Sequence, residues 1–257
     1  MIGNVAAGPQ VSITGLGCKV PDRVVTNDDL AKFVDTTDEW IVERTGIRER
    51  RVAADDQALS DIALPAARAA LEQSGTPGAD VDLIIVATVT PDMAFPSAGA
   101  ILADELGADG SGGAQLYLPA GGSRAPASAE TIAERKHYVQ MNGREVFKFA
   151  TRVLVSSAEK VLAECGKKID DVDVYIPHQA NVRIIDHAAE KLGIPKEKIV
   201  VNVERYGNTS SGSIPLALAD AQADGRLQDG ALVLMTGMGA GLTWGSGLIE
   251  WTTNGRK

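Results

Sequence analysis

Two short motifs carry residues whose types and positions could do chemistry. Pro177-His178-Gln179-Ala180-Asn181 follows one apolar run, and Tyr206-Gly207-Asn208-Thr209-Ser210 follows a second. In α/β proteins, ligands meet side chains at the carboxyl ends of the strands. An imidazole and a carboxamide at one sheet edge could both donate hydrogen bonds to a single oxygen, which stabilises an enolate or an oxyanion. On spacing alone, a capping histidine and a turn asparagine explain the same residues.

Strands and helices alternate around these motifs, which predicts an α/β fold. In the second half, the pattern predicts strands over 114–118, 172–176, 199–203, 231–236 and 243–251, and helices over 143–164, 181–192 and 211–224. In the first half it predicts strands over 11–17 and 81–88, and helices over 27–33, 38–46, 60–74 and 97–106. The helix over 38–46 would place Trp40 and Arg44 on one face, as a ring and a guanidinium suited to an adenine and a phosphate.

Composition limits the classes of function. The 257 residues are 44% apolar and carry a net charge of −9, which disfavours nucleic acid and requires a local basic patch for any acidic partner. The two cysteines, Cys18 and Cys165, lack metal-ligand spacing and indicate a reducing compartment without structural zinc. No apolar run reaches the length of a membrane span, so we expect a cytoplasmic protein with no metal and no membrane contact.

Further segments extend the pattern over nearly the whole chain: Thr36-Thr37-Asp38-Glu39-Trp40-Ile41-Val42-Glu43-Arg44-Thr45-Gly46, Ala94-Phe95-Pro96-Ser97 and Gly237-Met238-Gly239-Ala240-Gly241. Together with the two motifs, they resemble β-ketoacyl-acyl carrier protein synthase III, an acyltransferase of the thiolase-fold condensing enzymes. The resemblance implies a layered α-β-α-β-α fold built from two similar halves. It also implies decarboxylative condensation of an acyl-CoA starter, usually acetyl-CoA, with malonyl-acyl carrier protein to begin fatty acid synthesis.

The resemblance assigns roles to residues at matching positions. The coenzyme A thioesters are substrates, no cofactor is implied, and the family forms homodimers. The implied roles are catalysis at His178 and Asn208; coenzyme A binding at Thr36, Trp40 and Arg44; docking of acyl carrier protein at Lys148 and Arg183; an oxyanion loop at Gly239, Ala240 and Gly241; and an acyl-pocket residue at Phe95. For Lys148 and Arg183, solvated surface charge is an equal alternative.

The family's nucleophilic cysteine has no counterpart in this sequence. No cysteine lies between Cys18 and Cys165, and the motif Leu-Gly-Ala at 106–108 resembles both the segment before the nucleophile strand and the start of the second half. We therefore expect an internal deletion of about 75 residues, judged from the usual spacing of such folds. It would leave a truncated N-terminal thiolase-like half over 1–108 and a complete C-terminal half over 109–257.

Without that cysteine, this chain is predicted to be deficient in condensation. Malonyl decarboxylation does not require the thiol, so residual decarboxylation at His178 and Asn208 is expected. Part of the family's dimer interface lies in the missing stretch, which leaves the homodimer open. The alternatives are a non-catalytic remnant that binds acyl-CoA or acyl carrier protein, and a gene-model artefact.

Overall fold

A four-stranded sheet forms the centre of the computed structural model, which describes residues 13–57, 59–81, 87–88, 105–108, 110–121 and 125–252. The strand order is β3-β8-β7-β6, with β3 at Glu105–Ala108, β6 at Val174–Pro177, β7 at Leu232–Gly239 and β8 at Thr243–Glu250. Strands β6 and β7 run parallel, with Pro177 opposite Thr236. Strand β8 returns antiparallel to β7 through a tight turn, and β3 pairs antiparallel with the outer edge of β8.

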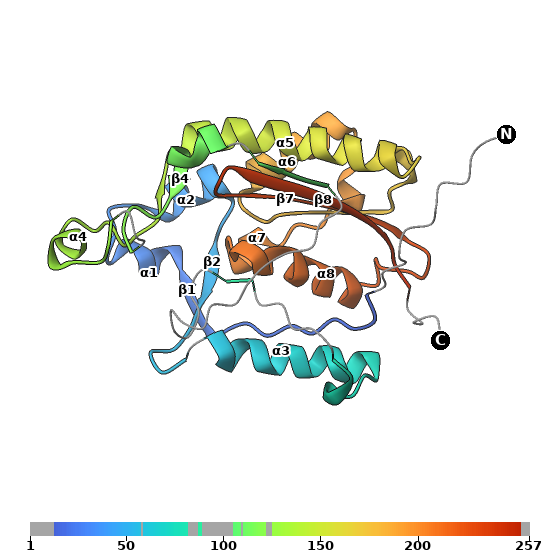
Figure 1. The fold of residues 1–257 in the computed structure, drawn as a ribbon, viewed down its shortest axis with the longest axis horizontal. Coiled ribbons are helices and arrows are strands. Elements are labelled where there is room, and N and C mark those ends of the chain that lie inside the picture. Colours follow the sequence, from blue (N-terminus) through green and yellow to red (C-terminus); the bar gives the residue numbers. More distant parts are fainter. Residues whose placement is uncertain are drawn as a thin grey trace.

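Helices cover both faces of this sheet (Figure 1). Helices α5 (Gly143–Glu164) and α6 (Val182–Leu192) pack on one face, where Tyr175, Ile185 and Leu234 belong to one buried cluster. Helix α8 (Ser213–Ala223) packs on the other face, where Ile176 and Val233 join Ala217 in a second cluster. The apolar spacing that predicted these three helices therefore marks the sides that face the sheet.

The N-terminal elements are tied together by a buried polar cluster. Strands β1 (Arg23–Thr26) and β2 (Glu49–Val52) form a hairpin-like pair, joined by helices α1 (Asn27–Ala31) and α2 (Asp38–Thr45). Asn27 is 1% exposed, and its amide donates to Asp38 Oδ1 and to the Ile47 carbonyl, both at 2.8 Å. Arg50 Nη2 donates to Asn27 Oδ1 at 2.7 Å. A buried amide with all its hydrogen-bonding groups satisfied fixes the angle between these elements.

Helix α3 (Leu59–Ser74) lies beyond α8 in Figure 1. Residues 13–17 run along α3 without forming the predicted strand. A Cβ at Gly15 would lie 2.1 Å from the Ala70 carbonyl oxygen, and one at Gly17 would lie 1.9 Å from that of Ala66. These glycines let the backbone pack directly on a helix, so the apolar pattern there reflects helix contact and not a sheet ladder.

Two further predicted elements differ from the structure. The strand expected over 199–203 is reduced to one bridge between Ile199 and Tyr175, and helix α7 (Val203–Tyr206) begins at its end. A side chain takes the place of a neighbouring strand there: Asn202 N–H donates to Gln179 Oε1 at 2.9 Å and not to a strand carbonyl. The helix expected over 97–106 is wrong at its end, because Glu105 and Leu106 pair with β8 and satisfy its edge. Residues 97–104 and the strand core at 82–86 lie outside the described residues.

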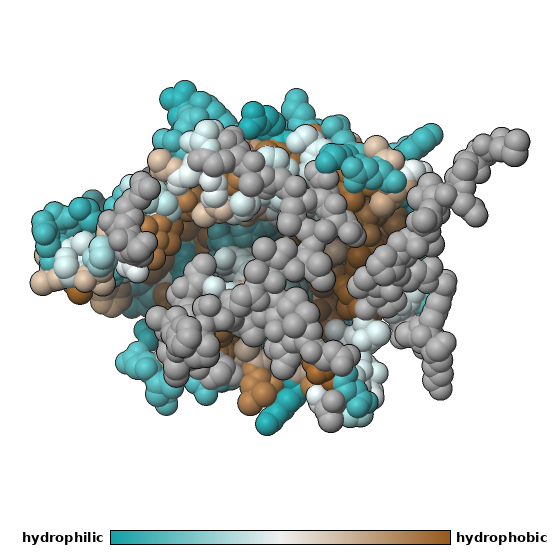
Figure 2. All heavy atoms as spheres, viewed as in Figure 1, coloured by the Kyte–Doolittle hydropathy of each residue, from teal (hydrophilic) through white to brown (hydrophobic). Residues whose placement is uncertain are grey.

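Residues 116–121 and 125–141 form an arm that projects from the body beside α1 (Figures 1 and 2). It contains strands β4 (Leu116–Tyr117) and β5 (Gln140–Met141), which pair, and helix α4 (Ala129–Ala133), which the sequence analysis missed. A Ser128 and Thr131 capping box explains the start of α4. Several large apolar side chains of the arm are exposed, namely Tyr117, Leu118, Ile132, Tyr138, Val139 and Met141.

Short 3₁₀ turns connect the main elements at Gly78–Asp80, Gly110–Gln115, Ile169–Asp171, Lys196–Lys198 and Ser210–Gly212. None of the helices in the described part of the chain combines the length and apolar character needed to cross a bilayer.

Gly46 joins α2 to the rest of the fold and gives a test of this packing. Its φ of +77° ends α2 in the left-handed region, and a Cβ there would lie 2.6 Å from Val182 Cγ1. We expect Gly46→Ala to lower the free energy of unfolding by about 2 to 4 kcal/mol in urea titrations, from backbone strain plus overpacking. Gly193→Ala is the matched control, because its φ is +72° and nothing lies within 4 Å of its Cβ. An equal loss in both variants would contradict the packing argument.

Candidate functional site

His178 is the first residue after strand β6 and is held by its backbone and its ring. Its N–H donates to the Thr236 carbonyl at 2.7 Å, which continues the parallel pairing of β6 with β7. Its Nδ1 lies 2.5 Å from Ser213 Oγ, in the first turn of α8. Burial lowers the pKa of His178 below the ordinary 6.5, so the ring is neutral at pH 7. As the pH falls below 6.5, this histidine is protonated more readily in the unfolded chain than in the folded chain. His178 therefore lowers the free energy of unfolding in acid.

Gln179 anchors the loop that follows His178. It is 1% exposed, and its Nε2 donates to the carbonyls of Pro177 at 2.8 Å and Val200 at 3.0 Å. Its Oε1 accepts from Asn202 N–H, and Asn202 Nδ2 donates in turn to Asp220 at 2.6 Å. The amide network therefore fixes the backbone on which the imidazole stands.

Asn208 lies in the turn between α7 and the 3₁₀ turn at Ser210–Gly212. Its Oδ1 accepts from Ser210 N–H at 2.9 Å, which sets the orientation of the carboxamide. Asn208 Nδ2 makes no hydrogen bond within the described part of the chain. Asn208 is exposed, so its two amide protons are available as donors.

The structure connects the two predicted catalytic residues through one segment. Ser213 lies five residues after Asn208 and contacts the His178 ring directly. Helix α7, just before Asn208, packs on β2, where Arg48 N–H donates to the Glu204 carbonyl at 3.2 Å. The N-terminal half thus supports the asparagine turn, while the sheet supports the histidine.

The predicted glycine loop is the turn between β7 and β8. Gly239 ends β7, Thr243 begins β8, and Thr243 Oγ1 donates to the Ala240 carbonyl at 3.0 Å. Gly241 has φ of +141°, a conformation that favours glycine. Because β7 continues past Thr236, this turn lies at the same end of the sheet as His178.

Helix α2 presents the predicted coenzyme residues. Thr37 caps the helix by accepting from Trp40 N–H at 3.2 Å. Trp40 is 53% exposed, and the Arg44 guanidinium carbon lies 4.8 Å from the centre of its ring. Thr36 Oγ1 is buried and has no hydrogen-bond partner among the described residues. The exposed ring and guanidinium lie together, as their spacing predicted.

A pocket of about 460 Å³ joins α2 to the amino ends of α5 and α6, and we call it the basic pocket. Four cationic side chains line it together with Phe147 and Asn181: Arg44, Arg144, Lys148 and Arg183. Arg183 stacks on Phe147, with its guanidinium carbon 5.6 Å from the ring centre, and Lys148 pairs with Glu145 at 2.8 Å. Residues assigned separately to the coenzyme and to the carrier protein therefore meet at one pocket. Sequence reasoning missed Arg144, although its place one turn before Lys148 on α5 was a usable signal.

Asn181 links the basic pocket to His178. Its Oδ1 caps α6 by accepting from Arg183 N–H at 2.9 Å, and its Nδ2 donates to the Arg44 carbonyl at 3.0 Å. The loop that carries the imidazole is therefore bonded to the end of the helix that carries Trp40.

Other predicted positions lie elsewhere. Phe95 falls outside the described residues. Cys165 is the C-cap of α5, at the opposite end of that helix from the basic pocket. Burial and the nearby Asp220 carboxylate raise the pKa of the Cys18 thiol, which disfavours the thiolate. The described residues hold no group of three or more histidine, cysteine and acidic side chains placed to bind a metal.

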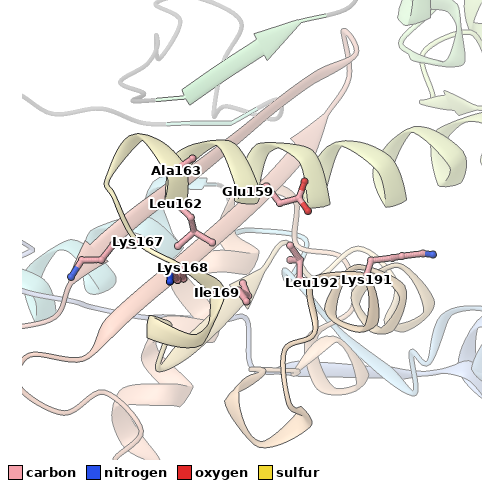
Figure 3. Close-up of a pocket in the computed structure, with 8 residues that line it drawn as sticks. All are labelled: Glu159, Leu162, Ala163, Lys167, Lys168, Ile169, Lys191 and Leu192. Atoms are coloured by element: carbon pink, nitrogen blue, oxygen red, sulfur yellow. The ribbon is translucent and has the colours of Figure 1, made fainter.

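A second pocket, of about 270 Å³, lies near the carboxyl end of α5, where Leu162, Ile169 and Leu192 form its apolar wall (Figure 3). In Figure 3 the Lys167 and Lys191 side chains extend to opposite sides, away from each other. Polar groups there do not converge on one point, as they do in ligand sites. None of the residues that the sequence analysis singled out for function lines this pocket.

Comparisons with known proteins agree with this geometry. The family described as 3-Oxoacyl-[acyl-carrier-protein (ACP)] synthase III C terminal matches residues 162–251. The β-ketoacyl-[acyl-carrier-protein] synthase III of Symbiobacterium thermophilum is 43% identical, over 94% of this chain and 98% of the relative. The crystal structure of the synthase III from Thermus thermophilus superposes with a TM-score of 0.82 at 35% identity, over 95% of this chain and 100% of that one. The Aquifex aeolicus enzyme gives 0.83 at 33% identity, over 94% and 100%.

The mixed sheet between helix layers and the match to these structures define a thiolase-like condensing enzyme. This confirms the predicted thiolase-like α/β fold, whereas the truncation of its N-terminal half stays a prediction. Several relatives at more than 30% identity over nearly the whole chain carry one and the same description. The chain belongs to the β-ketoacyl-[acyl-carrier-protein] synthase III family, which are acyltransferases.

Proposed function

We propose that this chain binds the thioester substrates of its family and decarboxylates malonyl thioesters, but does not complete the condensation. The single observation that carries this is the arrangement at the end of β6. There a neutral, mostly buried imidazole is bonded to Ser213, in the segment that also carries Asn208, whose amide protons have no hydrogen-bond partner among the described residues. Two neutral donors that reach the same oxygen stabilise the negative charge that develops on an enolate.

The proposed reaction balances without the cysteine. The bond between the malonyl Cα and its carboxylate breaks, and its electron pair moves onto Cα and the thioester oxygen as carbon dioxide leaves. His178 and Asn208 donate hydrogen bonds to that oxygen while it carries the negative charge. Solvent then protonates Cα, and the product is an acetyl thioester.

The basic pocket supports the proposed partners. The relatives' name states that they act with acyl carrier protein, and we propose the same partner here, together with acyl-CoA. The chain carries a net charge of −9, yet the described residues that line this pocket include four cations, of which Lys148 is paired with Glu145. Phosphate groups and acidic side chains are therefore attracted to this site more than to the rest of the surface.

The absence of the nucleophilic cysteine is part of this proposal. It is supported by the length of the chain and by the positions of its two cysteines. The alignment with the Symbiobacterium thermophilum relative runs over 323 positions, whereas this chain has 257 residues, so at least 66 aligned positions have no residue here. The difference supports an internal gap of the size expected near residue 108. The division at 108 and 109 stays a prediction, and the pairing of β3 with β8 favours a boundary just before Glu105.

One alternative function has an observation in its favour. Trp40, Arg44 and the basic pocket are complete without any cysteine, so a non-catalytic module that binds coenzyme A or acyl carrier protein would use the same surface. Saturable binding of coenzyme A without release of carbon dioxide from malonyl thioesters would favour that reading.

The test measures both half-reactions on the purified chain. With malonyl-acyl carrier protein alone, we expect carbon dioxide and acetyl-acyl carrier protein to form. With acetyl-CoA added, we expect no acetoacetyl product. Formation of that product would contradict the absence of a nucleophile, and absence of carbon dioxide would contradict decarboxylation. Sequencing the source DNA across codons 106–110 tests the gap directly, because an in-frame segment with a cysteine motif there would identify this chain as a gene-model artefact.

A further inference from the structure

Ser213 is a buried serine whose hydroxyl faces the ring of His178. It is 2% exposed, and its Oγ lies 2.5 Å from His178 Nδ1. The same Oγ accepts from Gln179 N–H at 3.3 Å. The Ser213 hydroxyl, at the start of α8, therefore contacts both the His178 ring and the backbone of the next residue, Gln179.

The proton of the Ser213 hydroxyl has one partner in this geometry. A hydroxyl donates one hydrogen bond and accepts up to two, and Gln179 N–H already takes one acceptor position. Among the described residues, His178 Nδ1 is the only other polar atom bonded to Ser213 Oγ. When the hydroxyl donates to Nδ1, the ring proton of a neutral histidine is on Nε2.

We propose that Ser213 is a positioning residue that holds His178 in the tautomer with its proton on Nε2. This rests on the proposed function, because only that tautomer lets Nε2, the ring nitrogen that does not face Ser213, donate to a substrate oxygen. The reverse arrangement, with Nδ1–H donating to Ser213, would leave Nε2 as an acceptor that repels an enolate oxygen. A wrong tautomer in otherwise intact geometry is enough to stop catalysis in other histidine sites.

The first test reads the tautomer without any activity. The chain has three histidines, so ¹⁵N-labelled histidine spectra are simple, and His178→Gln assigns the signals. In the intact chain we expect His178 Nε2 to resonate as a protonated nitrogen and Nδ1 as an unprotonated one. In Ser213→Ala we expect a mixture of both tautomers. A protonated Nδ1 in the intact chain, or an unchanged tautomer in Ser213→Ala, would overturn the proposal.

The second test compares activity with a matched loss of a buried hydroxyl. Ser157 is also 2% exposed and bonds to Ser246 Oγ at 2.6 Å, without a hydrogen bond to His178 among the described residues. We expect Ser213→Ala to lower the rate of carbon dioxide release by about 10-fold, as loss of an orienting partner does. Ser157→Ala should leave the rate unchanged at a similar cost in stability, and Ser213→Thr, which keeps the hydroxyl, should recover most of it. Equal rates in the two alanine variants would overturn the positioning role.

The two tests separate this proposal from the proposed function. If the intact chain releases no carbon dioxide while its spectra give the Nε2-protonated tautomer lost in Ser213→Ala, then decarboxylation fails and the role of Ser213 stands. If carbon dioxide is released and the tautomer does not depend on Ser213, the proposed function stands and this inference fails.

Discussion

Replacement of His178 by alanine is expected to lower the rate of carbon dioxide release from malonyl-acyl carrier protein by about 10² to 10³-fold, the usual effect of removing one donor to an oxyanion. The change removes the imidazole donor that we propose and leaves Asn208 as the other proposed side-chain donor. The measurement is release of labelled carbon dioxide at saturating substrate, so that a change in binding does not enter the result.

His187→Ala is the control for this experiment. His187 lies on α6, only nine residues after His178, and is partly buried on a helix outside both motifs. We expect His187→Ala to release carbon dioxide at the rate of the unaltered chain. A rate for His178→Ala within 2-fold of that control would remove the main support for decarboxylation at this site.

Reversing two charges at the basic pocket should weaken binding of acyl carrier protein by roughly 10 to 100-fold at low ionic strength. The double variant Lys148→Glu and Arg183→Glu replaces two of the four cations that line the pocket with carboxylates. Both the lost attraction and the new repulsion act on an acidic or phosphorylated partner. The difference should shrink in 0.5 M salt, because screening shortens the range of surface charge interactions. Equilibrium binding of labelled carrier protein at two salt concentrations measures both effects.

The matched control reverses two lysines at the other end of α5. Lys167→Glu and Lys191→Glu change the net charge by the same amount beside the pocket of Figure 3, about 20 to 30 Å away along a helix of 22 residues. If docking depends on the basic pocket, this variant should bind the carrier protein with only a small loss. Equal weakening in both double variants would mean that net charge, and not the pocket, governs association.

Local signals predicted the second half of the fold well. Helix α5 spans the residues that its apolar spacing predicted, and α6 begins one residue later than predicted, because Asn181 is its N-cap. The strand over 199–203 could not be predicted correctly, because Ile199, Val200 and Val203 are buried by neighbouring elements while the segment pairs with β6 only through the bridge between Ile199 and Tyr175. Gly15 and Gly17 were interpreted as the end of a strand. In the structure they allow close contact with α3, which depends on tertiary packing and cannot be predicted from local sequence.

The sequence indicated individual candidate residues of the site but not the contacts between them. His178 follows an apolar run, so its place at the end of β6 could be expected, whereas Asn208 follows helix α7 and not the strand that was predicted before it. Nothing in the sequence indicated a role for Ser213, because a serine at the start of an apolar helix is typical of a helix cap. Its partner, His178, lies 35 residues earlier in the chain. The meeting of Arg44 with Arg183 depends on how α2 packs against α6, a contact between residues more than 130 positions apart.

The hydrogen bond from Asn181 to the Arg44 carbonyl has a consequence for how binding and chemistry communicate. Asn181 stands three residues after His178, so any shift of α2 on ligand binding pulls on the short loop that aims the imidazole. If the coenzyme binds at Trp40 and the thioester at His178, as we propose, thermodynamic reciprocity requires each ligand to change the affinity of the other by the same factor. The Asn181 hydrogen bond would then couple the two proposed binding sites.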